Sequence, residues 1–277
     1  MRSEIGRVAV VTRRVQQRTK SIAGTLAALL IAMASGIAGP LEDGRLAFER
    51  GDYATASRHW KPLAEQGHPD AQVLIGMMNY NGLGGRQDYA EAAKWYRKAA
   101  DQGAVIAAFS LGTMFYFGQG VLRDATEAGR WYRLAADAGD DQAQANLGAM
   151  YDKGDGLPQD YVEAVRWYLR AANQGNAQAQ SNLGTMFFSG HGVPQDYVEA
   201  YRWFDLASSE FQRLARADGI PAQNREAIAE RMTEFHEMAV RNRDTVAARM
   251  TSDQIATAQR RASEWKPRPE RPSPGRF

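Results

Sequence analysis

The fold is decided by the stretch Asp88-Tyr-Ala-Glu-Ala-Ala-Lys-Trp-Tyr-Arg-Lys-Ala-Ala-Asp-Gln-Gly103, because its pattern returns along the chain at a constant interval. The aspartates that open the copies lie 36 residues apart, with no insertion between them: Asp52, Asp88, Asp124, Asp160 and Asp196. Aspartate at the start, apolar residues three or four apart and glycine at the end are typical of a short capped helix. A period of this length indicates a solenoid of tandem helix pairs.

Aromatic residues recur seven and eight places after these aspartates, apart from His59 in the first copy. The tryptophans at the seventh place are Trp95, Trp131, Trp167 and Trp203. The other helix of each period carries a glycine in its middle, at Gly76, Gly112, Gly148 and Gly184. Glycine inside a helix is about 1 kcal/mol less favourable than alanine, so its repeated use predicts helices packed too closely for a side chain. We expect the tryptophans and these glycines to form the structural core of the repeats.

Two runs of sequence resemble the Sel1-like repeat, a relative of the tetratricopeptide repeat. They are Asp88–Gly103 and Ala179-Gln-Ser-Asn-Leu-Gly-Thr-Met-Phe-Phe-Ser-Gly-His-Gly-Val193. The resemblance covers about residues 41–208. It implies repeats at 69–104, 105–140, 141–176 and 177–208, after a capping pair at 41–66. The implied fold is all-α, a right-handed α/α solenoid of Sel1-like helix pairs with a helical C-terminal cap, and the implied role is an interaction scaffold.

The first 38 residues have the composition of an export signal. Six basic side chains precede an uncharged, apolar stretch from Ile22 to Ala38. Small residues lie at the spacing of a cleavage site, and Ala38 is its expected end. An uncleaved anchor is the alternative, because the stretch is of marginal length for a bilayer span. We therefore expect a periplasmic or secreted protein or, alternatively, one anchored in the inner membrane with its repeats outside the cytoplasm.

Residues 209–265 continue the helical pattern beyond the repeats. Residues 209–217 extend the last repeat helix, and a turn at Gly219-Ile-Pro221 precedes a long helix over residues 222–250. Apolar residues recur on that helix at steps of three or four, with Asn242 as an exception: Ile228, Met232, Phe235, Ala239 and Val246. This spacing suits a helix packed along a partner, either as a hairpin that caps the solenoid or as an arm for binding or self-association.

The C-terminal end is predicted to hold one more helix and a tail. Thr251-Ser-Asp-Gln254 is a capping box, which predicts a last helix from Ser252 to Trp265. Residues 266–277 contain four prolines and mixed charge, so we expect them to form a disordered tail.

The composition argues against several classes of function. The chain has no cysteine and its four histidines lack metal-ligand spacing, so we expect no metal and no cofactor. Residues 39–210 hold 15 basic and 22 acidic side chains, which argues against nucleic acid as a partner. Some Sel1-like proteins have been associated with β-lactamase activity, but the single Ser-x-x-Lys motif, Ser263-Glu-Trp-Lys266, has no Lys-Thr-Gly or Ser-Asp-Asn motif beside it. We expect no catalytic residue and no enzyme.

The concave face of the solenoid is the expected binding surface. In the related tetratricopeptide fold the first helix of each pair lines this face, and the corresponding positions here vary between repeats while the scaffold positions do not. The residues assigned to a protein partner in this way are Tyr80, Phe109, Thr113, Tyr116, Phe117, Asp152, Lys153, Thr185 and Phe188. The alternative is that some of these aromatic side chains only pack within the solenoid.

These patterns predict a non-catalytic interaction scaffold in the cell envelope, which binds an unidentified protein through its concave face. One form of this hypothesis is a regulator of an envelope signalling protein. Two alternatives stay open: an enzyme or ligand-binding protein acting on cell-wall or β-lactam material, and a self-associating structural protein that uses residues 222–250. Contact with a membrane is expected only through the N-terminal segment, if that segment is not cleaved.

Overall fold

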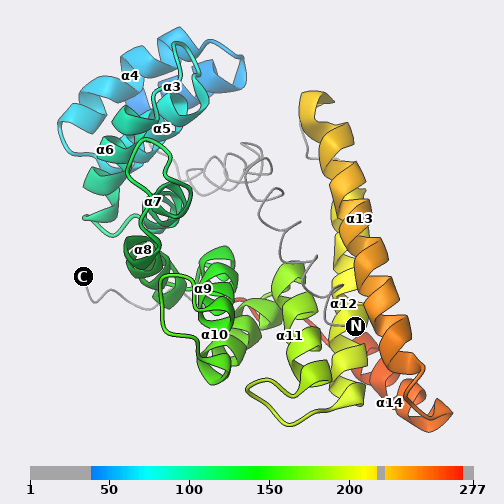
Figure 1. Cartoon of the computed structure of the whole chain (residues 1–277). Helices are drawn as coiled ribbons and strands as arrows, with labels where there is room; N and C mark the ends of the chain where they lie inside the picture. Colours follow the sequence, from blue (N-terminus) through cyan, green and yellow to red (C-terminus); the bar gives the residue numbers. More distant parts are fainter. Residues whose placement is uncertain (1–38, 217–221, 271–277) are drawn as a thin grey trace.

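The computed structural model describes residues 39–216 and 222–270, and within these residues all regular structure is helical. Twelve helices follow one another in this part of the chain, and Figure 1 shows them arranged along a curve. This confirms the predicted all-α solenoid. The predicted export signal at residues 1–38 and the predicted turn at residues 219–221 lie outside the described residues.

Ten of these helices form five consecutive pairs. The pairs are α3 (Pro40–Glu49) with α4 (Tyr53–Glu65), α5 (Pro69–Asn81) with α6 (Tyr89–Ala100), α7 (Val105–Phe117) with α8 (Ala125–Asp137), α9 (Asp141–Lys153) with α10 (Tyr161–Asn173), and α11 (Ala177–Ser189) with α12 (Tyr197–Ala215). In Figure 1, α7 and α9 lie on the inner side of the curve, and α8 and α10 lie on the outer side. The helices described here include none long and apolar enough to cross a membrane.

The recurrent aspartates set where the second helix of each pair begins. In all five pairs the aspartate is the N-cap, and its side chain accepts a hydrogen bond from a backbone N–H in the first turn. Such a cap satisfies a donor that the helix itself leaves unpaired and contributes about 1 kcal/mol. The period of 36 residues therefore fixes the starting points of the helices.

The mid-helix glycines receive the aromatic ring that lies eight residues after each aspartate. A Cβ atom at Gly148 would lie 2.7 Å from Cδ1 of Tyr168, and one at Gly112 would lie at the same distance from Cδ1 of Tyr132. A Cβ atom at Gly76 or Gly184 would lie 2.9 Å from the ring of Tyr96 or Phe204, respectively. Each glycine thus lets a buried ring lie directly on the backbone of its paired helix, which is the close approach that the sequence predicts.

The row of tryptophans lies at the interface between successive pairs. Trp95, Trp167 and Trp203 are buried, whereas Trp131 is only half-buried and donates from Nε1 to Glu127 at 2.9 Å. Arginines lie over these rings: for Trp167, Arg170 of the same helix lies 4.6 Å from the ring centroid, and Arg133 of α8 lies 5.9 Å from it. The tryptophans therefore lie at the border of the core with a cationic side chain above them.

Two further helices close the C-terminal end: α13 (Ala222–Ala247) and α14 (Ser252–Ser263). Figure 1 shows α13 folded back along α12, and the two helices contact each other through the rings of Phe211 and Phe235, 5.3 Å apart. Phe235, Ala239 and Val246 of the predicted stripe are buried. The hairpin arrangement, and not a projecting arm, is what the structure shows. The capping box of Thr251 and Gln254 begins α14.

The prediction of a disordered tail from residue 266 onward is wrong for the part that the structure describes. Residues 266–270 lie against the third repeat, where the backbone N–H of Arg268 donates to the carbonyl of Asn173 at 2.7 Å. Glu270 forms a salt bridge with Arg170 at 2.7 Å. Specific polar contacts hold the proline-rich segment, and its composition does not reveal them. Residues 271–277 lie outside the described residues.

Candidate partner-binding surface

All nine predicted contact residues come from α5, α7, α9 and α11, so the solenoid brings them to the side formed by the first helix of each pair. Their environments nevertheless differ. Tyr80, Tyr116, Asp152 and Phe188 occupy one row, at equivalent positions in successive repeats, and all are half-buried. Phe117 and Lys153 belong to the next row, in which Lys153 is exposed. The rows therefore have to be considered separately.

The first row joins each repeat to the next. The hydroxyl of Tyr80 donates to Oε1 of Gln119 at 2.9 Å. One repeat further, the hydroxyl of Tyr116 donates to Oδ2 of Asp155 at 2.7 Å. In both cases the acceptor lies 39 residues later, in the glycine-flanked loop of the following repeat. These tyrosines hold adjacent repeats together, which sequence reasoning missed; the one signal in the sequence is that the two tyrosines and the two acceptors each recur after 36 residues.

The same row continues with different chemistry in the third and fourth repeats. Burial raises the pKa of Asp152, while the positive charge of Lys153 and the neighbouring His191 oppose this rise. His191 is the loop residue equivalent to Gln119 and Asp155. At the end of the row, the guanidinium of Arg249 lies 4.9 Å from the centroid of the Phe188 ring. The turn between α13 and α14 thus supplies the contact that a further repeat would make.

The prediction that Thr113 contacts a partner is wrong. It is buried, and its hydroxyl forms a hydrogen bond of 3.1 Å with the hydroxyl of Tyr132. Thr113 follows the glycine on which the Tyr132 ring lies, so its side chain faces the seam between α7 and α8. The ring centroids of Phe109 and Tyr132 lie 5.9 Å apart, which fits the alternative that some of these aromatic residues pack within the solenoid.

The second row carries the accessible part of the surface. Its members are Asn81, Phe117, Lys153 and Ser189, of which Lys153 and Ser189 are exposed. The Phe117 ring lies edge-on to Tyr116 at 5.0 Å. Thr185, one turn earlier on α11, is half-buried and donates to the carbonyl of Ser181 at 3.2 Å. An amide, a ring, an ammonium group and a hydroxyl at equivalent positions give each repeat a different surface.

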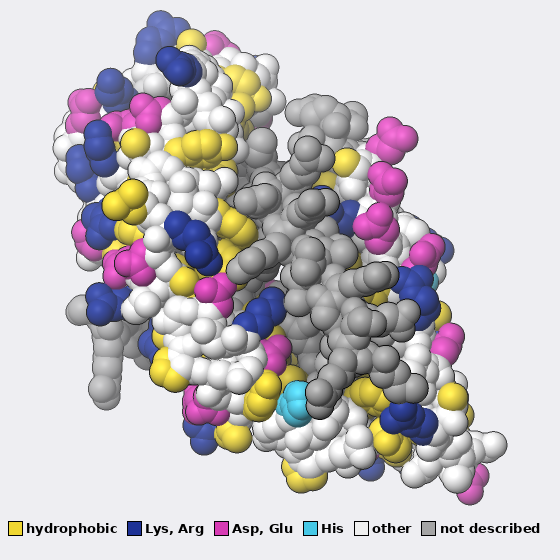
Figure 2. All heavy atoms as spheres, viewed as in Figure 1, with side chains coloured by type: hydrophobic (Ala, Val, Ile, Leu, Met, Phe, Trp, Pro, Cys, Tyr) yellow, Lys and Arg dark blue, Asp and Glu magenta, His cyan; other side chains and the backbone are white. Residues whose placement is uncertain are grey.

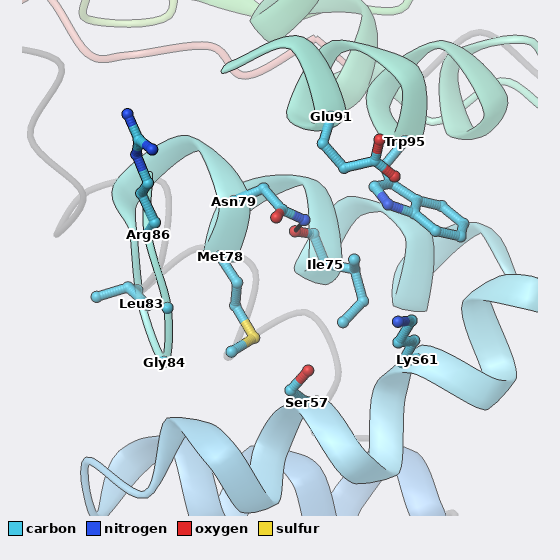
Figure 3. A pocket seen from close by; sticks show the side chains of 11 residues that line it. Ser57, Lys61, Ile75, Met78, Asn79, Leu83, Gly84, Arg86, Glu91 and Trp95 are labelled. Atoms are coloured by element: carbon cyan, nitrogen blue, oxygen red, sulfur yellow. Dashed lines mark hydrogen bonds between the residues drawn. The ribbon is translucent and has the colours of Figure 1, made fainter. Parts of the chain in front are cut away.

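A separate cleft of about 200 Å³ lies between α4, α5 and α6 (Figure 3). Ile75 and Met78 of α5 contribute apolar surface to it, and Figure 3 shows Met78 pointing toward Ser57 on α4. Trp95 of α6 closes one side, and Lys61 lines the cleft from α4. Charged side chains of both signs also line the cleft, so its apolar surface lies beside polar groups. None of the predicted contact residues lines it.

The cleft exists because the first repeat lacks two large side chains that the later repeats carry. It has Asn79 and Gly85 at positions where the later repeats have an aromatic and a branched aliphatic residue. Those pairs are Phe115 with Val121, Tyr151 with Leu157, and Phe187 with Val193. All six pack against the hydrophobic core. Superposing the repeats in the sequence would have shown this difference.

The charged and potentially ligating side chains of the described residues are dispersed over the surface (Figure 2). On the face that Figure 2 shows, basic and acidic side chains are interspersed over the repeats, and acidic side chains follow α13. Within the described residues no group of three or more histidine, aspartate or glutamate side chains could hold a metal ion. Ser263 lies exposed at the end of α14, where its hydroxyl donates to the carbonyl of Arg260 at 2.8 Å.

Comparison with protein-family models assigns the repeats. The model of the Sel1 repeat matches residues 69–103, 105–140, 141–176 and 177–210, which together make up about half of the chain. The chain belongs to the Sel1 repeat family. The matched boundaries agree within two residues with the repeats predicted from the sequence. Sel1 repeats indicate a protein-interaction scaffold, and proteins with these repeats typically bind protein partners.

Solved structures of other Sel1-type proteins share the fold. A Sel1 repeat protein from Oxalobacter formigenes is 31% identical, with a TM-score of 0.58 over 72% of this chain and 84% of its own. The protein c5321, a protective antigen present in uropathogenic Escherichia coli strains, is 29% identical, with a TM-score of 0.60. That match covers 81% of this chain but 53% of c5321. No curated protein matches the sequence.

Proposed function

We propose that this Sel1 repeat protein is a non-catalytic scaffold of the cell envelope, which binds one protein partner along the inner side of α5 to α11. The observation that supports the proposal is that the packing contacts of the repeats stay constant while their exposed side chains vary. The glycine beneath an aromatic ring recurs in all four repeats. The surface row of Asn81, Phe117, Lys153 and Ser189 changes its chemistry at every step. A surface that varies on a constant frame suits recognition of one particular partner.

The envelope location rests on the composition of residues 1–38, in which six basic residues precede an uncharged apolar stretch. If the protein is in the envelope, its partner is there too. We propose that this partner is a signalling protein of the envelope, which the scaffold regulates. Cell fractionation with an antibody against the repeats tests the location. Recovery of the protein in the cytoplasmic fraction alone would contradict it.

The surface assignment is tested by changing its exposed side chains without touching the contacts between repeats. Tyr116 is unsuited to this purpose, because its loss would also break the hydrogen bond to Asp155. Lys153 and Ser189 are exposed, so Lys153→Glu combined with Ser189→Arg changes charge and size but leaves the core intact. Arg260→Glu, at an exposed position on α14, is the matched control.

The three proteins are compared by crosslinking in envelope extracts, followed by quantitative mass spectrometry. We expect the double variant to lose a specific partner at least tenfold, while Arg260→Glu retains it and both variants unfold at the wild-type urea concentration. Equal recovery of the same partner with the double variant would reject the inner side of the solenoid as the binding surface.

The alternative of self-association through residues 222–250 is based on the apolar stripe of α13, and the structure buries this stripe within the chain. Phe235, Ala239 and Val246, the apolar stripe of α13, are buried within the chain, against α12 and α14. The exposed side of α13 carries acidic residues, including Glu230, Glu234 and Glu237. Like charges on this side disfavour the close parallel approach of two such helices.

A further inference from the structure

The segment after α14 is held on the third repeat by a small group of polar side chains. Arg170 donates to both carboxylate oxygens of Glu270, from Nε at 2.9 Å and from Nη2 at 2.7 Å. Gln144 donates from Nε2 to the same carboxylate at 3.0 Å. The backbone N–H of Glu270 donates to Oε1 of Gln174 at 3.2 Å. Together these three residues form a receptor for a glutamate and its own backbone N–H.

The first repeat contains the same group of residues. Gln72, Lys98 and Gln102 precede Gln144, Arg170 and Gln174 by 72 residues each, which is two complete repeats. Gln102 donates to Oε1 of Gln72 at 2.8 Å, and Gln174 donates to Oε1 of Gln144 at 2.9 Å. Gln72 and Gln144 also donate to equivalent backbone carbonyls, at 3.1 and 3.0 Å.

The cationic side chains of the two groups are held in the same way. Nζ of Lys98 lies 4.3 Å from the centroid of the Trp95 ring, and the guanidinium of Arg170 lies 4.6 Å from that of Trp167. Lys98 is exposed, and no ion pair with another described residue involves it. The side chain of Gln72 is buried and has one amide hydrogen beyond the one donated to Ala64. A carboxylate placed between Gln72 and Lys98 would accept from both.

The second and fourth repeats show that the solenoid does not need this group for its stability. The second repeat has Ala108, Leu134 and Ala138 at the three positions. The fourth repeat keeps only the first glutamine, Gln180, whose Oε1 is buried without a hydrogen-bond partner. Among the four repeats, all three side chains therefore occur together only in the third, which holds Glu270, and in the first.

We propose that Gln72, Lys98 and Gln102 form a second receptor for an extended peptide bearing a glutamate, supplied by a partner protein. The chain's own segment is engaged on the third repeat through Glu270, and Lys98 is exposed. The ligand is a carboxylate side chain whose backbone N–H points to Gln102, as the backbone N–H of Glu270 points to Gln174. This receptor lies at the start of α5 and the end of α6, away from the surface row at the ends of the first helices.

Two differences predict that the first receptor binds more weakly than the third. Lysine presents a single ammonium group, where arginine presents two parallel donors to a carboxylate. Asp101 adds a negative charge where the third repeat has Asn173. Changing both residues to those of the third repeat should therefore strengthen binding, which gives the proposal a gain-of-function test.

The probe is a fluorescent peptide with the sequence Lys-Pro-Arg-Pro-Glu-Arg, copied from residues 266–271, and its binding to the full chain is measured by fluorescence anisotropy. We expect Lys98→Ala, or glutamine in place of the peptide's glutamate, to weaken binding roughly fivefold or more. Lys98→Arg with Asp101→Asn should tighten it by a similar factor. Lys94→Ala, an exposed lysine one turn earlier on α6, is the control and should leave binding unchanged.

Three outcomes would overturn the proposal. Binding that survives Lys98→Ala but disappears in Arg170→Ala would mean that the peptide only displaces the chain's own segment from the third repeat. Failure of the Lys98→Arg, Asp101→Asn variant to bind the peptide would mean that the first repeat holds no receptor. A dimer that appears with Arg170→Ala and vanishes when Lys98→Ala is added would identify a second copy of this chain, and not a partner, as the ligand.

Discussion

The repeats and the C-terminal hairpin are held together in different ways. Within the repeats one small contact recurs without change, a glycine backbone beneath an aromatic ring. The hairpin of α12 and α13 depends on a few larger side chains, with Phe211 against Phe235 near one end and Val246 packed near the other. An added side-chain atom at these contacts should therefore destabilise the repeats. The hairpin should instead be destabilised by the loss of a large side chain, and we expect it to open independently of the repeats.

The largest effect is expected where the backbones of two repeats touch. A Cβ atom at Gly156 would lie 2.4 Å from the backbone carbon of Ala125, and Gly156 has a φ of 78°, a conformation unfavourable for alanine. Gly156→Ala should lower the free energy of unfolding by about 3–5 kcal/mol, from the strained conformation and the clash together. Urea unfolding followed by circular dichroism measures this loss.

Gly154→Ala separates these two causes. Gly154 has a φ of 68°, but its nearest neighbour would be a side-chain atom, Cβ of Gln159, at 3.2 Å. We expect a loss of only about 1–2 kcal/mol, which is the conformational part alone. Equal losses in the two variants would show that the contact between repeats does not limit stability.

The hairpin should respond locally to a loss of volume. Phe235→Ala removes the ring that packs on Phe211 and should destabilise the hairpin by about 3 kcal/mol. Hydrogen exchange should become faster across α13 and stay unchanged in α5 to α10, because the repeats do not use this contact. Met232→Ala, which truncates a half-buried neighbour, should have a smaller effect. Faster exchange throughout α5 to α10 would instead make the hairpin essential to the whole solenoid.

The parts that follow the period could be predicted from the sequence. The aspartate caps, the mid-helix glycines and the aromatic rows each recur every 36 residues, and one helix pair therefore describes them all. The environment of a single side chain could not be predicted in this way. Thr113 occupies a position expected on the surface, yet it is buried because the Tyr132 hydroxyl lies beside it.

The contacts between repeats were equally hidden. Whether Tyr116 binds a partner or the next loop depends on how closely that loop approaches, which composition does not reveal. The bound position of Glu270 depends on two glutamines and an arginine that lie about 100 residues or more away in the sequence. A proline-rich segment with mixed charge looks disordered unless the residues that receive it are known.

A charged, half-buried cap distinguishes the third repeat from the fourth. Burial raises the pKa of Asp140, the N-cap of α9, to about 6. An unfolded aspartate titrates near 3.9, so the folded state binds the proton more tightly and this group makes the protein less stable as the pH rises from about 4 to about 6. The next repeat has Asn176 at the equivalent position, where it caps α11 without a charge.

Asp140→Asn should therefore raise the free energy of unfolding at pH 7.5 by about 1–2 kcal/mol and flatten its dependence on pH between 4 and 6. Asn176→Asp is the reciprocal change and should introduce a pH dependence of the same sign. Urea unfolding at pH 4.5, 6 and 7.5 measures both. Lower stability of Asp140→Asn at pH 7.5 would show that the charge at this cap is favourable.

The smallest effect on stability is expected from the contact between Arg170 and Glu270, although it decides whether the C-terminal segment stays bound. Arg170→Leu places there the residue that the second and fourth repeats carry, as Leu134 and Leu206. The pair is partly exposed, so the free energy of unfolding should fall by no more than about 1 kcal/mol. The backbone N–H groups of Arg268 and Glu270 are bonded to the third repeat, and their hydrogen exchange should become at least tenfold faster.

Acid should release the segment in the same way. The hydrogen bonds from Arg170 hold the pKa of Glu270 below its ordinary value. The contribution of the ionised carboxylate is therefore complete above the unfolded pKa of about 4.3 and is lost as the pH falls through the lower folded value. Arg166→Leu, which removes only an exposed pair with Glu163, is the control and should leave both amides protected. Protection that persists in Arg170→Leu would mean that the backbone hydrogen bonds hold the segment without the salt bridge, and the arginine would then be dispensable to the receptor of the third repeat.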